Sequence, residues 1–169
     1  MKPRTLCLHA FLSIGALGMD GSAALAQNLG NWRALTAEEE KARIANVSPE
    51  SVDPAMIEAD FDGDGRKDKA LIAVRKSDGV FGLIAILKGR IHVLDTDLVE
   101  ASDGLRYAEP RTWDTICGMP ASANDASCDE YPSRVILKNP GILWIGNGRT
   151  SLYFWSRKTK SFDVVLMVD

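Results

Sequence analysis

The stretch DFDGDGRKDKALIAVRKSDGVFGLIAILKG (residues 60–89) decides the fold. It begins with four aspartates set around two glycines. It continues with apolar runs at residues 69–76 and 80–89, which a Ser-Asp-Gly turn separates. Short apolar runs bounded by Gly, Asp and Ser are typical of β-strands. The stretch therefore predicts a β-hairpin that is preceded by an acidic loop.

The same pattern of short apolar runs and tight turns continues to the end of the chain. Further strands are predicted at residues 90–98, 133–138, 142–146, 149–156 and 161–168. Asn147-Gly148 between two apolar runs is a strong hairpin signal, and residues 106–133 have the character of a loop. We expect a mainly β fold of antiparallel meander sheets, arranged as a small sandwich, an open barrel or a partial propeller.

One short N-terminal helix is predicted before the first strand, within residues 36–47. Thr36 can cap its N-terminus, and Glu39 three residues later can complete a capping box. The apolar side of this helix would consist of Leu35, Ala42, Ile44 and Val47.

The first 26 residues have the composition of a secretory signal peptide. Two basic residues precede an apolar run at residues 6–19, and an Ala-Leu-Ala sequence ends at Ala26. The apolar run is shorter than the roughly 20 residues of a membrane-spanning helix. We therefore expect a signal peptide at residues 1–26 and a single β-rich domain at residues 27–169. That domain would be exported, periplasmic or extracellular, with no membrane span after cleavage.

The composition argues against nucleic acid as a partner. The chain has 20 Lys and Arg residues against 23 Asp and Glu residues, for a formal net charge of −3. Nucleic-acid-binding domains are usually basic or carry a basic patch. We expect the partner to be a protein or a component of the cell envelope.

Two cysteines, Cys117 and Cys128, remain after removal of the predicted signal peptide. An even number of cysteines in an exported chain is typical of a disulfide. The spacing is too wide for a C-x-x-C redox pair, and no histidine lies nearby to complete a zinc site. We expect a bridge that contributes about 3 kcal/mol by restricting the unfolded chain. The bridged loop would serve either as a structural staple or as a rigid recognition loop.

The aspartates at the start of the quoted stretch have the spacing of a calcium-binding loop. Asp60, Asp62, Asp64 and Asp68 occupy positions 1, 3, 5 and 9, and Gly65 occupies position 6. Calcium loops of the D-x-D-x-D-G kind supply oxygen ligands at these positions, with a backbone carbonyl at position 7. That position is Arg66. An EF-hand would also need a glutamate at position 12, where this chain has Leu71 before a predicted strand.

The loop and the hairpin after it resemble the FG-GAP (VCBS-type) repeat of integrin-like β-propellers, over about 30 residues. In that family, a D-x-[DN]-x-D-G-x-x-D loop joins two strands and binds calcium. The resemblance implies that Ca²⁺ is held by Asp60, Asp62, Asp64 and Asp68, with the carbonyl of Arg66. The family usually carries several copies of the motif, whereas this chain has a single copy. The closing segment, residues 153–169, also resembles the final hairpin of small exported bacterial proteins, which implies no activity.

An acidic turn without a metal is the alternative for the aspartate loop. Two like charges 4 Å apart repel by about 4 kcal/mol at an effective dielectric constant of about 20. The basic side chains of Arg66, Lys67 and Lys69 could offset this repulsion if the carboxylates splay outward. They could not easily do so if the carboxylates converge, which is why convergence indicates calcium.

The sequence favours a non-enzymatic module that binds another macromolecule, of which a periplasmic inhibitor or immunity protein would be one form. His92 is the one histidine left after signal cleavage, and it lies in a predicted strand. The alternative is a hydrolase of envelope polymers that acts through acidic residues, with Asp95 and Asp97 as the candidates. On the strand at residues 149–156, Tyr153 and Trp155 share one face, and Leu152 and Phe154 share the other. Core packing is the expectation for these aromatic residues; the alternative is that one face presents them to a protein or sugar.

Overall fold

The computed structural model describes residues 29–45, 52–120, 126–129, 131–146 and 148–167. The predicted signal peptide, its cleavage site at Ala26 and the turn residue Asn147 lie outside these ranges. Within them the fold is mainly β, with antiparallel sheets and one α-helix, as predicted. No helix of the described ranges is long and apolar enough to cross a membrane.

The first sheet contains the predicted hairpin. Its strands are β1 (Trp32–Ala34), β2 (Met56–Ala59), β3 (Asp68–Arg75), β4 (Phe81–Leu87) and β5 (Arg90–Asp95). Their order is β1-β3-β4-β5, and β2 pairs with β3 beside β1. The aspartate loop therefore connects β2 to β3 at one end of this sheet.

The second sheet is built from the C-terminal half of the chain in the order β11-β10-β9-β6. Its strands are β6 (Gly104–Ala108), β9 (Gly141–Gly146), β10 (Arg149–Ser156) and β11 (Ser161–Leu166). A two-stranded sheet of β7 (Thr112–Asp114) and β8 (Arg134–Ile136) lies between β6 and β9 in the chain. The prediction of a loop over residues 106–133 is wrong for β7 and most of β6, because their pairing partners are distant in sequence.

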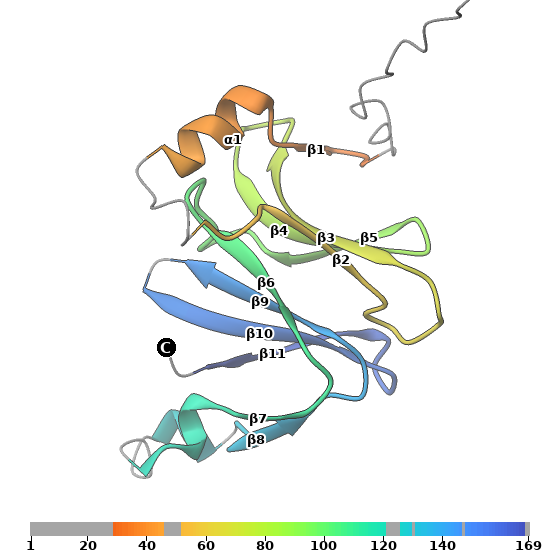
Figure 1. The fold of residues 1–169 in the computed structure, drawn as a ribbon, viewed down its shortest axis with the longest axis vertical. Helices are drawn as coiled ribbons and strands as arrows, with labels where there is room; N and C mark the ends of the chain where they lie inside the picture. The colour runs from red at the N-terminus through yellow and green to blue at the C-terminus, as the bar shows by residue number, and fades with distance from the viewer. Residues whose placement is uncertain (1–28, 46–51, 121–125, 130, 147, 168–169) are drawn as a thin grey trace, which may run out of the picture.

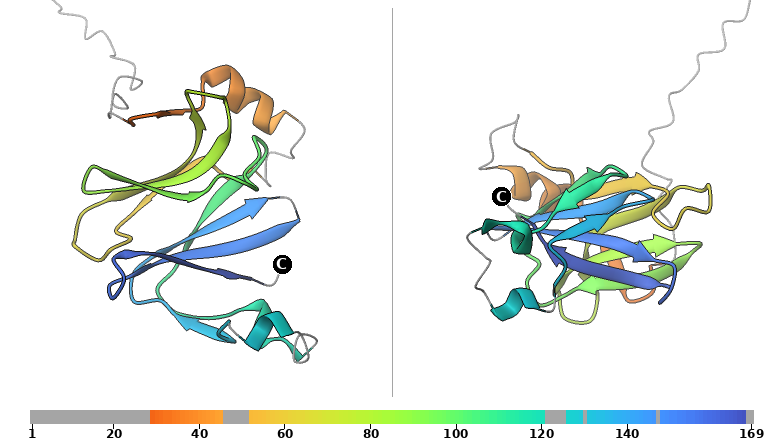
Figure 2. Two further views of the ribbon diagram at one scale, coloured as in Figure 1. Left: turned by 180° about the vertical axis from the view of Figure 1, so that it is seen from behind. Right: turned by 90° about the horizontal axis from the view of Figure 1, so that it is seen from below.

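The two larger sheets pack face to face, as Figures 1 and 2 show, and this corresponds to the sandwich among the predicted architectures. The core between them combines residues of both sheets, including Ile72, Leu83, Leu105 and Trp144. The β7–β8 pair covers the outer face of the second sheet, where Val135 packs with residues of β10 and β11. Helix α1 (Ala37–Ile44) lies at the opposite end of the molecule from this pair.

The strand β10 shows how side-chain alternation produces this layering. Tyr153 and Trp155 face the core between the sheets, whereas Leu152 and Phe154 face the β7–β8 pair. Successive side chains of a strand point to opposite faces, so β10 contributes to two hydrophobic clusters at once. The predicted core packing of these aromatic residues is confirmed.

The helix α1 has the predicted capping box. The Glu39 amide donates to the Thr36 hydroxyl at 3.1 Å, and the Thr36 amide donates to the Glu39 carboxylate at 2.8 Å. The predicted apolar side is not the buried side among the described residues, because Leu35 and Ile44 are half-buried, Ala42 is exposed, and the residue that α1 buries is Arg43. Val47 lies outside the described ranges. The Arg43 guanidinium donates to the Glu40 carboxylate and to the carbonyl of Asp103, and these partners offset the cost of burying the charge.

The predicted disulfide between Cys117 and Cys128 is present. The bridge joins two short 3₁₀-helices, at Ile116–Gly118 and Ala126–Asp129, which follow β7 and precede β8 in the chain. Close to this bridge, Thr115 forms an isolated β-bridge with Met167. The disulfide segment therefore lies against the end of β11.

Candidate metal centre

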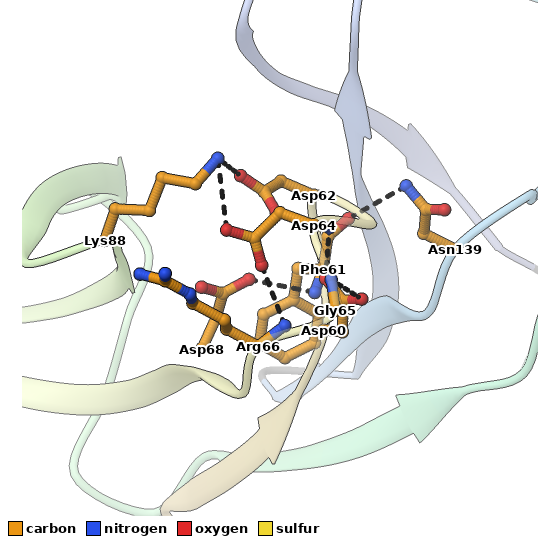
Figure 3. A network of polar contacts seen from close by, with 9 residues as sticks. All are labelled: Asp60, Phe61, Asp62, Asp64, Gly65, Arg66, Asp68, Lys88 and Asn139. Carbon is orange, nitrogen blue, oxygen red and sulfur yellow. Dashed lines mark hydrogen bonds and ion pairs between the residues drawn. The ribbon is translucent and has the colours of Figure 1, made fainter.

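The aspartate loop folds back on itself between β2 and β3 (Figure 3). Gly63 and Gly65 have φ angles of 72° and 86°, in the left-handed region that glycine adopts without strain. These two glycines allow the chain to turn twice in a few residues. The turns bring the side chains at the start and the end of the loop together.

Three carboxylates converge in the loop. Asp60, Asp62 and Asp68 each offer one oxygen, and these oxygens all lie within 4.8 Å of one another. Calcium–oxygen bonds are about 2.3–2.6 Å long, so two ligands on opposite sides of one ion lie about 5 Å apart. The spacing of the three oxygens therefore fits a shared calcium ion, and carboxylate oxygens are the donors that calcium prefers.

Backbone amides hold these carboxylates in place. Asp60 accepts hydrogen bonds from the amides of Asp64 and Gly65 at 2.9 and 2.8 Å. Asp68, which is buried, accepts one from the amide of Phe61 at 3.0 Å. The loop conformation thus depends on the carboxylates that would bind the ion.

The fourth predicted ligand, Asp64, does not join the other three carboxylates but pairs with Lys88. The ammonium of Lys88, from the turn between β4 and β5, lies 3.2 Å from an Asp64 oxygen and 2.8 Å from an Asp62 oxygen. The other Asp64 oxygen accepts the amide of Arg66 at 2.8 Å. Asp64 would therefore have to turn from Lys88 to complete the predicted ligand set. Ligation by the Arg66 carbonyl stays a prediction.

The charges of the loop are offset unevenly. The Arg66 amide and the Lys88 ammonium hold the pKa of Asp64 below its usual value. By contrast, burial raises the pKa of Asp68, and the nearby negative charges of Asp62 and Asp64 raise it further. Two carboxylates thus share one ammonium while the buried Asp68 carboxylate has too little positive charge around it. A bound cation would supply that charge.

The basic residues expected to neutralise an acidic turn have only a small part in this arrangement. Lys69 pairs with Glu58 on β2 at 3.3 Å instead of with the loop. Arg66 and Lys67 are exposed, and neither forms an ion pair among the described residues. Three of the four carboxylates converge rather than splay, and such a group could hold a metal ion.

The loop is anchored to the second sheet as well as to the first. The Phe61 ring is fully buried and meets the Phe162 ring of β11 edge-on, with the ring centroids 6.5 Å apart. The Asn139 side chain, from the turn before β9, donates to the Phe61 carbonyl at 3.5 Å (Figure 3). The loop therefore connects the two layers of the sandwich.

His92 and Asp95 have structural contacts, whereas Asp97, the other acidic candidate of the hydrolase alternative, is on the surface. His92 packs edge-on against the rings of Trp155 and Phe162. One oxygen of Asp95 accepts the amides of Asp97 and Leu98, and so holds the turn after β5.

Comparison of the chain with protein-family models, with curated proteins and with solved structures finds no match. The resemblance to the FG-GAP repeat therefore rests on the residues of the loop and of the hairpin after it.

Sequence reasoning missed three residues of this centre, namely Phe61, Lys88 and Asn139. Phe61 carried a usable signal, because a large apolar residue inside an acidic loop is expected to be buried. Lys88 and Asn139 are 26 and 78 residues from their partners Asp62 and Phe61. Only the packing of the strands shows that these residues meet the loop.

A comparison of alanine substitutions at the two loop glycines tests the contact with the second sheet. A Cβ at Gly63 would lie 2.5 Å from the Asn139 side chain, whereas one at Gly65 would meet nothing within 4 Å. Both changes force alanine into a left-handed conformation, which costs about 1 kcal/mol. We expect Gly63→Ala to lower the free energy of unfolding in urea by more than Gly65→Ala does. The Cβ of Gly63→Ala would also lie 2.6 Å from the Arg157 guanidinium, so equal losses would show that the loop does not depend on its packing against Asn139 and Arg157.

Replacement of Lys88 tests whether its ammonium competes with calcium. Lys88→Met removes an ion pair worth up to about 1 kcal/mol at such exposure, so calcium should bind up to about fivefold more tightly in a calorimetric titration. Lys69→Met is the matched control, since it removes the same charge from a residue paired with Glu58. An affinity that Lys88→Met leaves unchanged, or weakens, would contradict the competition.

Proposed function

We propose that this chain is an exported, calcium-stabilised β-domain that binds another macromolecule and does not catalyse a reaction. A periplasmic inhibitor or immunity protein is one specific form of this function. The observation that carries the calcium part is the convergence of Asp60, Asp62 and Asp68 in a loop that contacts both sheets. An ion at that place stabilises the sandwich that presents a binding surface.

The stabilising role of the ion follows from what surrounds the loop. The ion would offset the repulsion among the carboxylates, and Asp64 and the Arg66 carbonyl would complete its ligand set. With the carboxylates fixed, the Phe61 amide keeps its bond to Asp68 and the Phe61 ring keeps its place against Phe162. Calcium would thus stabilise the contact between the two sheets of the sandwich.

Two observations support a binding role over a catalytic one. His92 is held among aromatic rings, and burial lowers its pKa. Asp95 uses one carboxylate oxygen to hold a turn. The disulfide, which is typical of oxidising compartments, supports export.

Thermal unfolding in calcium tests the metal site. Free calcium at 100 times the Kd should stabilise the protein by about 2.7 kcal/mol and raise the Tm accordingly. Asp68→Asn should remove most of this rise, because the amide keeps an acceptor for Phe61 but lacks the charge. The matched control is Asp163→Asn, an exposed residue of β11, which should leave the rise intact. An unchanged Tm in calcium would contradict the proposal.

Binding and catalysis are separated by experiments on envelope material. Immobilised protein should retain a stoichiometric partner from an envelope extract if the binding role is right. The hydrolase alternative instead predicts turnover of peptidoglycan or polysaccharide, which Asp95→Asn should abolish. That outcome, seen without a retained partner, would overturn the binding role.

A further inference from the structure

A group of exposed basic residues lies at one end of the sandwich, although the chain as a whole has a formal net charge of −3. The group comes from the aspartate loop and from the turns before β9 and after β10. None of its members forms an ion pair or a side-chain hydrogen bond among the described residues. We call this surface the basic end, and it consists of Arg66, Lys67, Lys138, Arg157, Lys158 and Lys160.

Contacts between these segments show that the basic end is one surface. Residues 157–160 form the turn from β10 to β11, and Arg157 begins this turn. A Cβ at Gly63 of the aspartate loop would lie 2.6 Å from the Arg157 guanidinium and 2.5 Å from the side chain of Asn139, which belongs to the turn before β9. Both turns of the second sheet therefore touch the loop of the first sheet, and Figure 1 shows them at the same end of the molecule.

The aspartate loop offsets only part of this positive charge. Lys88 and the six residues of the basic end carry seven positive charges, against four on the loop carboxylates. Lys88 pairs with two of these carboxylates, and Asp68 is buried. Asp97, beyond the end of β5, lies at the opposite end of the first sheet. The basic end is therefore a positive surface on a chain of mildly acidic composition, and such a surface attracts anionic partners.

A cavity of about 240 Å³ opens at the basic end, between the two turns of the second sheet. Lys138 and Arg157 line it, one from each turn, and the exposed Asp163 of β11 lines it as well. Neither cation forms an ion pair with this carboxylate. Ile136 and Phe154 supply an apolar part of the lining. The cavity thus presents two cations, a carboxylate and an apolar wall to one ligand.

This lining matches a ligand that carries both an acidic group and hydroxyl groups. An acidic group would pair with Lys138 and Arg157 by charge-assisted hydrogen bonds. Asp163 would repel a second acidic group, but its carboxylate can accept a hydrogen bond from a hydroxyl. The phosphodiester backbone of DNA has no donor for it. A sugar acid has both kinds of group, together with an apolar ring face that can lie on the apolar wall.

The size of the cavity and the spread of the charges point to a polymer. Pockets that enclose a whole drug-sized ligand have volumes of about 300–1,000 Å³, so a cavity of about 240 Å³ fits one unit of a longer chain. The remaining cations of the basic end lie outside the cavity lining, where further acidic units of the same chain would meet them.

We propose that the basic end binds an acidic polysaccharide of the cell envelope, with one sugar acid in the cavity between Lys138 and Arg157. The proposal rests on the macromolecule-binding role and names its surface and its partner. The acidic group of that sugar pairs with the two cations, and one of its hydroxyls donates to Asp163. Neighbouring acidic sugars pair with Lys158 and Lys160 on the turn after β10.

Calorimetric titration of the exported protein with hyaluronate and with chondroitin sulfate tests this surface, with dextran as the uncharged control. We expect binding of an acidic polysaccharide at low salt that weakens as salt is added, and no binding of dextran. Lys138→Gln and Arg157→Gln should each weaken the Kd about threefold to fivefold, as expected for loss of an exposed ion pair. Lys41→Gln removes the same charge from an exposed position of α1 and should leave the Kd unchanged.

Replacement of Asp163 separates sugar recognition from simple charge attraction. Asp163→Val removes a negative charge from the cavity, so a surface that acts through charge alone would bind the polysaccharide more tightly. We expect weaker binding instead, because the sugar hydroxyl loses its acceptor. Valine suits an exposed strand position, and circular dichroism and the Tm show whether each variant remains folded.

Four outcomes would overturn the proposal. They are no binding of either acidic polysaccharide at low salt, the same loss in Lys41→Gln as in Lys138→Gln, tighter binding by Asp163→Val, and equal affinity for single-stranded DNA or for phosphatidylglycerol vesicles. An envelope partner that the double variant Lys138→Gln, Arg157→Gln retains unchanged would also overturn it. In that case macromolecule binding stands and only the assignment of its surface fails.

Discussion

The structure depends on how the charges of the aspartate loop are balanced. Asp60, Asp62 and Asp68 are brought together by backbone amides and by two left-handed glycines. Convergence of like charges is unfavourable by several kcal/mol at the effective dielectric constant of a protein surface. The loop nevertheless holds Phe61 between the two sheets. Whatever offsets the repulsion therefore also stabilises the contact between the layers of the sandwich.

Lys88 and a bound ion are two ways to offset that repulsion, and they would contact different carboxylates of the loop. The Lys88 ammonium contacts Asp62 and Asp64 from the exposed side of the loop. Asp68 lies on the buried side, and the raised pKa of its carboxyl reflects both its burial and the uncompensated charge around it. A divalent cation among Asp60, Asp62 and Asp68 would also neutralise Asp60 and Asp68, with which Lys88 forms no ion pair. The lysine would then support the loop before calcium binds.

Local patterns in the sequence predicted the local parts of this structure. Alternation and turn residues predicted β3, β4, β9, β10 and β11, and the spacing of Thr36 and Glu39 predicted the helix cap. The even number of cysteines predicted the disulfide, and the spacing of the aspartates predicted four carboxylate ligands, of which Asp60, Asp62 and Asp68 do converge. Each of these features depends on residues close together in the chain or on a simple pairing rule.

The features that the sequence did not predict depend on distant partners. Arg43 replaces an apolar helix face because its guanidinium reaches the Asp103 carbonyl, 60 residues away. β6 is a short run with little periodicity to detect. Its partner β9 follows only after the disulfide segment, so no local turn signal marks the pair. Asp64 was predicted with the other ligands, but the fold of the β4–β5 turn brings Lys88 to it. In each case tertiary packing supplied a partner that local spacing could not indicate.

A crystal structure of the exported protein grown with calcium tests the central claim most directly. We expect an ion among Asp60, Asp62 and Asp68 with oxygen ligands at about 2.3–2.6 Å, and Asp64 turned from Lys88 towards it. The Lys88 ammonium in its present place at full occupancy, with only water among the three carboxylates, would contradict the claim that the loop is a calcium site.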